Sequence, residues 1–157
     1  MKIQGKKFDG PAVEIVPIIR GEEEIILKAQ AVLDYEDFHT ICPRPTPPEK
    51  MFPGGRKEVN VNDKKYIEDI NGYSNKKYAW MVLKSLEATE GLEWETIDMS
   101  KPDTWGNYNK ELTDSGFTEA EVVRILMAVT NAQGLNSDKI EEARKRFLAS
   151  PVAESEK

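Results

Sequence analysis

Two β-branched runs near the N-terminus predict a β-hairpin. The first run is Ala12–Ile19 and the second is Glu24–Val32, and the polar segment Arg20–Glu23, with its glycine, separates them. Valine and isoleucine runs on either side of such a turn are typical of two antiparallel strands. A hairpin alone is only marginally stable in water, so we expect it to pack against the helices that follow.

The order of apolar positions within the hairpin suggests how its faces are arranged. Successive side chains of a strand point to opposite faces, and we expect Val13 and Ile15 to share one face and Ile18 to join them. Pro17 has no N–H to donate, so the first strand lies at an edge or carries a bulge there. Residues 2–8 are a candidate third strand.

A segment rich in proline and glycine interrupts this pattern. Asp34 can cap a short helix, Tyr35–Cys42, which Pro43 stops. Residues 43–60 then contain five of the nine prolines, a composition that favours an extended loop. Two interpretations stay open: a surface connector, or a docking arm that becomes ordered on a partner. The apolar side chains of Met51 and Phe52 are the reason to keep the second.

Helical spacing of apolar residues begins near Asn62 and dominates the rest of the chain. The segment Asn71–Asn75 weakens this first helix or divides it in two. The next segment, Lys76–Ala88, carries apolar side chains three, four, seven and eight positions apart. This spacing predicts a helix, which we expect at the centre of the core.

The last third of the chain predicts three short helices. The first follows Pro102 and ends at Gly116, the second opens with the capping box Thr118–Glu121, and the third starts at Asn136 or Ser137. Because the loops between them are short, we expect these helices to be neighbours whose apolar stripes close on one small core.

These elements predict an α+β fold. It consists of an N-terminal β-hairpin or small antiparallel sheet, followed by a mainly helical body with a C-terminal three-helix segment. We divide the 157 residues into a β-hairpin plus short helix at 1–42, a Pro/Gly-rich loop at 43–60, a helical domain at 61–149 and a frayed tail at 150–157.

Composition and charge narrow the function classes. Hydrophobic residues make up 39% and charged residues 32% of the chain, which is typical of a polar but foldable globular protein. The net charge of −6 argues against binding to nucleic acid or to an anionic membrane surface. The single cysteine permits no intramolecular disulfide, and no apolar run is long enough for a signal peptide or a membrane span. We therefore expect a soluble protein of the cytoplasm.

The candidate chemical groups are sparse. His39 and Cys42 lie three positions apart on one helical face, but two ligands do not make a zinc site and the chain has no further His or Cys. We interpret the acidic clusters Glu22–Glu24 and Glu141–Glu142 as solvated faces rather than paired catalytic carboxylates. We therefore expect no enzyme, no catalytic residue, no metal and no cofactor.

Aromatic and apolar side chains favour a protein-binding surface instead. The candidates are Phe52, Trp94, Trp105, Tyr108 and Met127. Trp94 lies between Glu93 and Glu95, so it is either a core side chain or an aromatic contact with an acidic rim. Burial of any candidate in the folded chain removes it from this set.

Several segments of the chain together resemble one family of phage proteins. These segments are Ala79–Leu86, Leu92–Glu95, Asp103–Trp105, Glu111–Leu112, Gly116–Glu121 and Ala143–Leu148. Their pattern of aromatics and helix caps is similar to that of the small tail assembly chaperones of long-tailed bacteriophages that infect Gram-negative hosts. The likeness covers the last half of the chain.

This resemblance implies a function and a set of partners. Such chaperones bind the long tape measure protein and keep its hydrophobic helices soluble until the tail tube polymerises around it. They use no cofactor, act in the cytoplasm of the infected bacterial host and are absent from the mature virion. Many such phages also make a longer, frameshifted form. The implied partner is the tape measure protein or another tail protein; self-association is left open, and neither nucleic acid nor a membrane is expected.

Two other classes of protein stay open. A structural virion protein, such as a tail or head–tail accessory component, would remain in purified particles, whereas a chaperone leaves them. A small phage inhibitor of a host protein would be bound to that host protein rather than to a phage protein.

Overall fold

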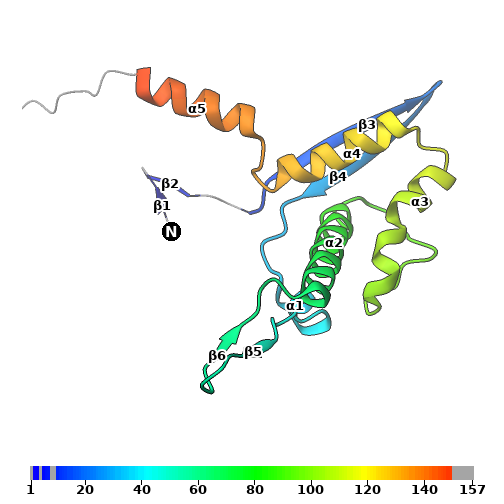
Figure 1. The fold of residues 1–157 in the computed structure, drawn as a ribbon. Helices are drawn as coiled ribbons and strands as arrows, with labels where there is room; N and C mark the ends of the chain where they lie inside the picture. Colours follow the sequence, from blue (N-terminus) through cyan, green and yellow to red (C-terminus); the bar gives the residue numbers. More distant parts are fainter. Residues whose placement is uncertain (1, 4, 8–9, 150–157) are drawn as a thin grey trace, which may run out of the picture.

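The chain adopts an α+β fold (Figure 1). This computed structural model describes residues 2–3, 5–7 and 10–149, so the frayed tail expected at 150–157 lies outside the described residues. Small antiparallel sheets lie toward the N-terminus and a mostly helical body follows, as the sequence predicts.

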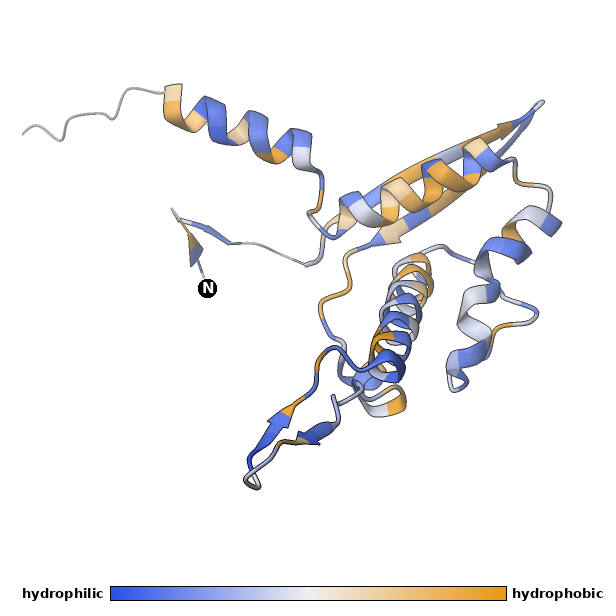
Figure 2. Cartoon of the chain, viewed as in Figure 1, coloured by the Kyte–Doolittle hydropathy of each residue, from blue (hydrophilic) through white to orange (hydrophobic). Residues whose placement is uncertain are grey.

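The main sheet is a hairpin of two long strands. β3 (Val13–Arg20) pairs with β4 (Glu23–Gln30) in antiparallel register along its whole length. Gly21, with a φ of 62°, makes the turn that the sequence predicts. The buried positions of the hairpin are Val16, Ile18, Leu27 and Ala29. Figure 2 shows apolar residues along both strands and along one stripe of the helix that lies across them.

The regular alternation of β3 corrects the expected arrangement of its faces. Val13 and Ile15 share one face, as predicted, and both are exposed. Ile18 does not join them, because no bulge interrupts the strand at Pro17, and it lies with Val16 on the buried face. One face of the hairpin therefore belongs to the core, and the other faces solvent.

Pro17 is tolerated because its backbone points away from β4. Both the N–H and the C=O of Lys28 bond Thr89, so Lys28 and every second residue along β4 turn their backbone groups outward. Pro17 lies opposite Ile26, which is two residues from Lys28 and also turns its backbone groups outward. The missing N–H of Pro17 therefore removes no hydrogen bond between the two strands. The Pro17 carbonyl accepts instead from Arg124 at 3.1 Å.

The helix that covers the buried face of this hairpin is α4 (Glu119–Ala132) (Figure 1). Its predicted capping box is confirmed: Thr118 Oγ1 accepts from the N–H of Glu121, and the Glu121 carboxylate accepts from the N–H of Thr118. Arg20, near the hairpin tip, donates to the Glu121 carboxylate and to the Gly116 carbonyl, each at 2.7 Å. The α4 side chains in the shared core are Val122, Ile125, Ala128, Val129 and Ala132.

A second part of the core is aromatic and surrounds α2 (Lys64–Leu86). This 23-residue helix runs without a break through Asn71–Asn75, where the sequence predicts a weakened or divided helix. A glycine inside a helix costs about 1 kcal/mol, and the packing of Tyr73 against the aromatic cluster offsets that cost. The cluster consists of Phe38 from α1 (Glu36–Ile41) together with Ala79, Trp80, Leu83 and Trp105.

Residues 43–60 are more regular than the loop that the sequence predicts. β5 (Glu49–Met51) and β6 (Lys57–Val59) pair as a short hairpin. Gly54 and Gly55, with φ of 93° and 81°, form its turn. The prolines of this segment lie outside the two strands, so no ladder donor is lost, and composition alone does not reveal the pairing.

The N-terminal segment forms a hairpin of its own. β1 (Lys2–Ile3) pairs with β2 (Lys6–Lys7) in a separate two-stranded sheet. The described part of residues 2–8 is therefore not a third strand of the main sheet. The residues of this segment pair with each other rather than with the main sheet.

The last three helices do not close on one core, contrary to the prediction. The first is a 3-10 helix, η1 (Pro102–Asn107), continued by α3 (Tyr108–Asp114). The last is α5 (Ser137–Ala149), where the Asn136 side chain accepts from the N–H of Lys139 at 3.0 Å. None of the described side chains of α5 is buried, and the helix projects from the body (Figure 1). The main apolar stripe of α4 packs on the hairpin and is therefore not available to α5.

Candidate partner-binding groove

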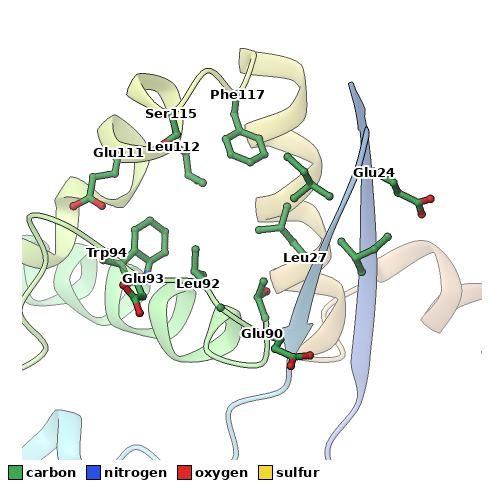
Figure 3. Close-up of a pocket in the computed structure, with 14 residues that line it drawn as sticks. Glu24, Leu27, Glu90, Leu92, Glu93, Trp94, Glu111, Leu112, Ser115 and Phe117 are labelled. Carbon is green, nitrogen blue, oxygen red and sulfur yellow. The ribbon is translucent and has the colours of Figure 1, made fainter. Parts of the chain in front are cut away.

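An apolar hollow lies between the edge of β4, the segment 89–94 and α3 (Figure 3). Its volume is about 380 Å³. The apolar side chains that line it are Ile25, Ile26, Leu27, Leu92, Trp94, Leu112 and Phe117. Leu92, Trp94 and Phe117 are only partly buried, so the hollow is an open groove rather than an internal cavity.

One threonine ties the first wall of the groove to β4. The N–H of Lys28 donates to Thr89 Oγ1 at 2.8 Å, and the Thr89 hydroxyl donates to the Lys28 carbonyl at 3.0 Å. These bonds satisfy two outward-facing backbone groups of the β4 edge. Gly91, with a φ of 75°, then turns the chain so that Leu92 and Trp94 line the groove.

One carboxylate fixes the opposite wall. Glu111 of α3 accepts from the backbone N–H of Glu95 at 2.9 Å, from that of Thr96 at 2.6 Å and from the Thr96 hydroxyl. Burial alone would raise the pKa of Glu111, but these hydrogen bonds outweigh burial and hold the pKa below its usual value. The ionised carboxylate therefore holds the segment that follows Trp94 against α3.

Trp94 belongs both to the core and to the groove. Its ring is partly buried and packs against the hairpin core and against the aromatic cluster. It also lines the groove, where Figure 3 shows it beside Leu92, with Leu112 and Phe117 across the hollow. Trp94 is therefore both a core side chain and a candidate contact for a partner.

The rim of the groove is acidic. Glu90 and Glu93 are exposed beside the hollow, and Glu111 stands on the opposite wall. Glu24 also lines the hollow, at its margin on β4, although its carboxylate points away from the centre of the hollow (Figure 3). A negative rim around an apolar floor suits a partner that presents an apolar side chain next to Lys or Arg.

Trp105 is removed from the set of surface candidates. Its side chain is fully buried, and its ring centroid lies 5.9 Å from that of Phe38. Its indole Nε1 has no acceptor among the described residues. It is the one large aromatic residue of η1, and its burial attaches η1 to α2. The prediction that it contacts a partner is wrong because the fold needs this side chain inside.

The three remaining candidates lie outside the groove. Tyr108 is half-buried against both parts of the core, and burial, with a smaller contribution from Tyr78, raises the pKa of its hydroxyl. Phe52 follows β5, where Lys50 Nζ lies 5.5 Å from its ring centroid. Met127 is exposed on α4 and borders a separate shallow hollow beside β3.

The candidate chemical groups also lie outside the groove. Nδ1 of His39 lies 3.4 Å from the Tyr73 hydroxyl. Burial raises the pKa of the Cys42 thiol, while Lys76 partly opposes this and Asp103 adds to it, so the thiol is protonated at neutral pH. Within the described residues, no group of three or more His, Cys, Asp or Glu side chains is placed to hold a metal ion.

No helix in the part of the chain that the structure describes is long and apolar enough to cross a membrane. No family model, no curated protein and no solved structure matches this chain.

Proposed function

We propose that this chain is a non-enzymatic binding protein that holds an apolar segment of another protein in its acidic-rimmed groove. The observation that carries this proposal is the convergence of apolar side chains from four parts of the chain on one open hollow. A volume near the lower end of the ~300–1,000 Å³ range of ligand sites accommodates one or two large apolar side chains. That size fits the anchor residues of a docked peptide.

The expected ligand is an amphipathic segment with basic neighbours. A helix docked in a groove presents anchors at positions i and i+3 or i+4. Lys or Arg beside those anchors would meet Glu90 and Glu93, which are exposed and whose carboxylates form no hydrogen bond or ion pair with the other described residues. Glu111 contributes negative charge but already accepts three hydrogen bonds from Glu95 and Thr96.

We further propose that the partner is a phage tail protein and that the chain acts as a tail assembly chaperone for the tape measure protein. The resemblance to such chaperones supports this proposal, because its segments Leu92–Glu95, Glu111–Leu112 and Gly116–Glu121 supply much of the groove lining. A groove that shields apolar anchors of a long helical protein is the property that a holding chaperone needs. This function requires no cofactor.

Affinity purification from phage-infected cells tests both the groove as a binding site and the chaperone assignment. The tagged full chain would be recovered, and mass spectrometry would be applied to the eluate and to purified virions. We expect a very long helical phage protein in the eluate and no copies of this chain in virions. We expect Leu92→Glu to lose that protein, because it places a further carboxylate in the groove. Ile67→Glu makes the same kind of change on α2, outside the groove, and should keep the protein.

The outcomes distinguish the groove from the chaperone assignment. If the protein that the wild type recovers and Leu92→Glu loses is not a long helical phage protein, the groove is supported and the chaperone assignment is overturned. Equal recovery with Leu92→Glu and with the wild type would overturn the groove as the binding site. High copy numbers of this chain in virions would also overturn the chaperone assignment.

A structural virion protein is the second candidate. One observation favours it: the solvent-facing side of the β3–β4 hairpin and the apolar stripe of α5 are exposed, as is common in subunits that contact neighbours of their own kind. Retention of the chain in purified virions at high copy number is the result expected for this candidate.

A further inference from the structure

The β3–β4 hairpin has one apolar face that no element of its own chain covers. By the alternation of the strands, this face carries Val13, Ile15, Pro17, Ile19 and Ile26. The exposed fractions are 48% for Val13, 61% for Ile15, 72% for Ile19 and 39% for Ile26. Because α4 packs only on the opposite face, these side chains form an apolar surface of the kind that marks a contact with another protein.

The same chain contains an amphipathic helix, α5, whose apolar stripe is not buried; at its start Ile140 and Ala143 border only a shallow hollow beside Glu14 and Asn131. The apolar side chains of α5 recur at Ile140, Ala143 and Phe147, spacings of three and four that place them on one stripe. Phe147 is 78% exposed, and no side chain of α5 is buried among the described residues. Figure 2 shows apolar residues interleaved with polar ones along this projecting helix. Most helices gain their stability from packing such a stripe.

The two surfaces match in length. The 13 residues of α5 span ~20 Å, and the eight residues of β3 span ~26 Å. α4, with 14 residues, already covers the opposite face of the hairpin along the same direction. A second helix on the solvent-facing side would complete a three-layer arrangement with the hairpin in the middle.

Their charges match in one orientation. The tip of the hairpin carries Glu22–Glu24, whereas Lys28 lies on the solvent-facing side nearer its base. The second half of α5 carries Arg144–Arg146, and its first half is acidic on balance, with Asp138, Glu141 and Glu142 against Lys139. With its C-terminal end at the hairpin tip, α5 brings its basic residues to the acidic tip and its acidic residues toward Lys28.

The end of α4 directs α5 away from its own hairpin. Gln133 is fixed from both sides: its Oε1 accepts from the N–H of Val32 at 2.9 Å, and its Nε2 donates to the Gln30 carbonyl at 3.3 Å. The N–H of Leu135 bonds the Thr130 carbonyl at 3.3 Å. These bonds hold the short connection on the α4 side of the hairpin, and α5 leaves it pointing outward (Figure 1).

We propose that two copies of this chain associate by exchanging α5, so that each α5 lies on the solvent-facing side of the β3–β4 hairpin of the other copy. In a dimer with twofold symmetry, one type of contact covers the apolar stripe of both α5 helices and the solvent-facing side of both hairpins. The groove around Trp94 faces α3 and shares Glu24 and Ile26, at its β4 margin, with the solvent-facing side of the hairpin. The exchange follows from α5 and the hairpin and does not rest on the proposed function.

Sedimentation of the full chain between ~1 and ~100 µM, a range that brackets micromolar association, tests the exchange. We expect a dimer for the wild type and a monomer for either Phe147→Glu or Ile15→Glu, with unchanged helix content because neither side chain is buried. Leu33→Glu, an equally exposed apolar position outside both surfaces, is the matched control and should remain dimeric. A monomeric wild type, or a dimer that survives either Phe147→Glu or Ile15→Glu, overturns the exchange.

Charge reversal provides the second test. One variant carries Lys at Glu22, Glu23 and Glu24, and the other carries Glu at Arg144, Lys145 and Arg146. We expect each variant to be monomeric at concentrations where the wild type is dimeric, and the chain with both sets of changes to recover the dimer. If the chain with both sets of changes does not dimerise, the exchange is overturned. It is also overturned if both variants that carry a single set of changes still dimerise. Trp94→Ala, which alters the groove, should leave the dimer unchanged.

Discussion

Two tryptophans that lie eleven positions apart in the sequence have different roles. Trp105 is fully buried in the aromatic cluster, whereas Trp94 is partly exposed in the groove. Trp105→Ala should lower the free energy of unfolding by ~3–5 kcal/mol, the range for a buried aromatic, and Trp94→Ala by clearly less. Urea unfolding followed by far-UV circular dichroism measures both. Equal losses would contradict the assignment of Trp94 to the groove surface.

Glu111 should make the stability of the chain depend on pH. Its pKa in the folded state is lower than its ordinary value of 4.5, so its hydrogen bonds stabilise the fold above that value. This stabilisation is lost as the pH falls through the lower, folded-state pKa. We expect the wild type to lose more unfolding free energy on acidification than Glu111→Gln does. Parallel pH dependences for the two proteins would show that Glu111 contributes nothing.

At the scale of single elements, the start of α4 depends on its cap. Thr118→Ala removes the acceptor for the Glu121 N–H and should cost ~1 kcal/mol of unfolding free energy. Thr113→Ala is the matched control, because the Thr113 hydroxyl only donates to the Asn109 carbonyl one helical turn earlier. We expect its effect to stay within ~0.5 kcal/mol. Thermal unfolding of the two variants side by side checks the difference.

Elements with strong local signals could be predicted from the sequence, and elements decided by packing could not. The hairpin and the capping box at Thr118 follow from the identity of adjacent residues, and both are confirmed. The continuity of α2 through Gly72 depends on the packing of Tyr73, which lies outside the reach of local propensity. The exposed position of α5 was also hidden, because an apolar stripe does not reveal whether a partner surface remains free.

The candidate groove was only partly accessible to sequence reasoning. Trp94 and its neighbour Glu93 could be identified because an aromatic between carboxylates is unusual for a core position. Leu27 and Leu112 looked like ordinary core residues, and 85 positions separate them in the sequence. Phe117 was visible only as the residue before a capping box. The hollow exists because the fold brings these segments together, and no local pattern encodes that proximity.

At the scale of the whole molecule, negative charge should set how fast a partner binds. Glu90→Lys reverses one charge of the groove rim and should slow association with the recovered partner, with a smaller effect at high salt. Glu68→Lys makes the same change at an exposed position of α2 away from the groove. Association rates at two ionic strengths measure both variants. Equal slowing by both would assign the effect to net charge rather than to the groove.

The contacts that complete the hairpin core span most of the chain and therefore set an order of events during synthesis. Arg20 bonds Gly116, 96 residues later, and Val32 bonds Gln133, 101 residues later. A ribosome adds ~5–20 residues per second, so the buried face of the hairpin waits roughly 5–20 s for the helix that covers it. During that interval the charged side chains of the nascent strands and the missing donor of Pro17 are what discourages pairing with other chains.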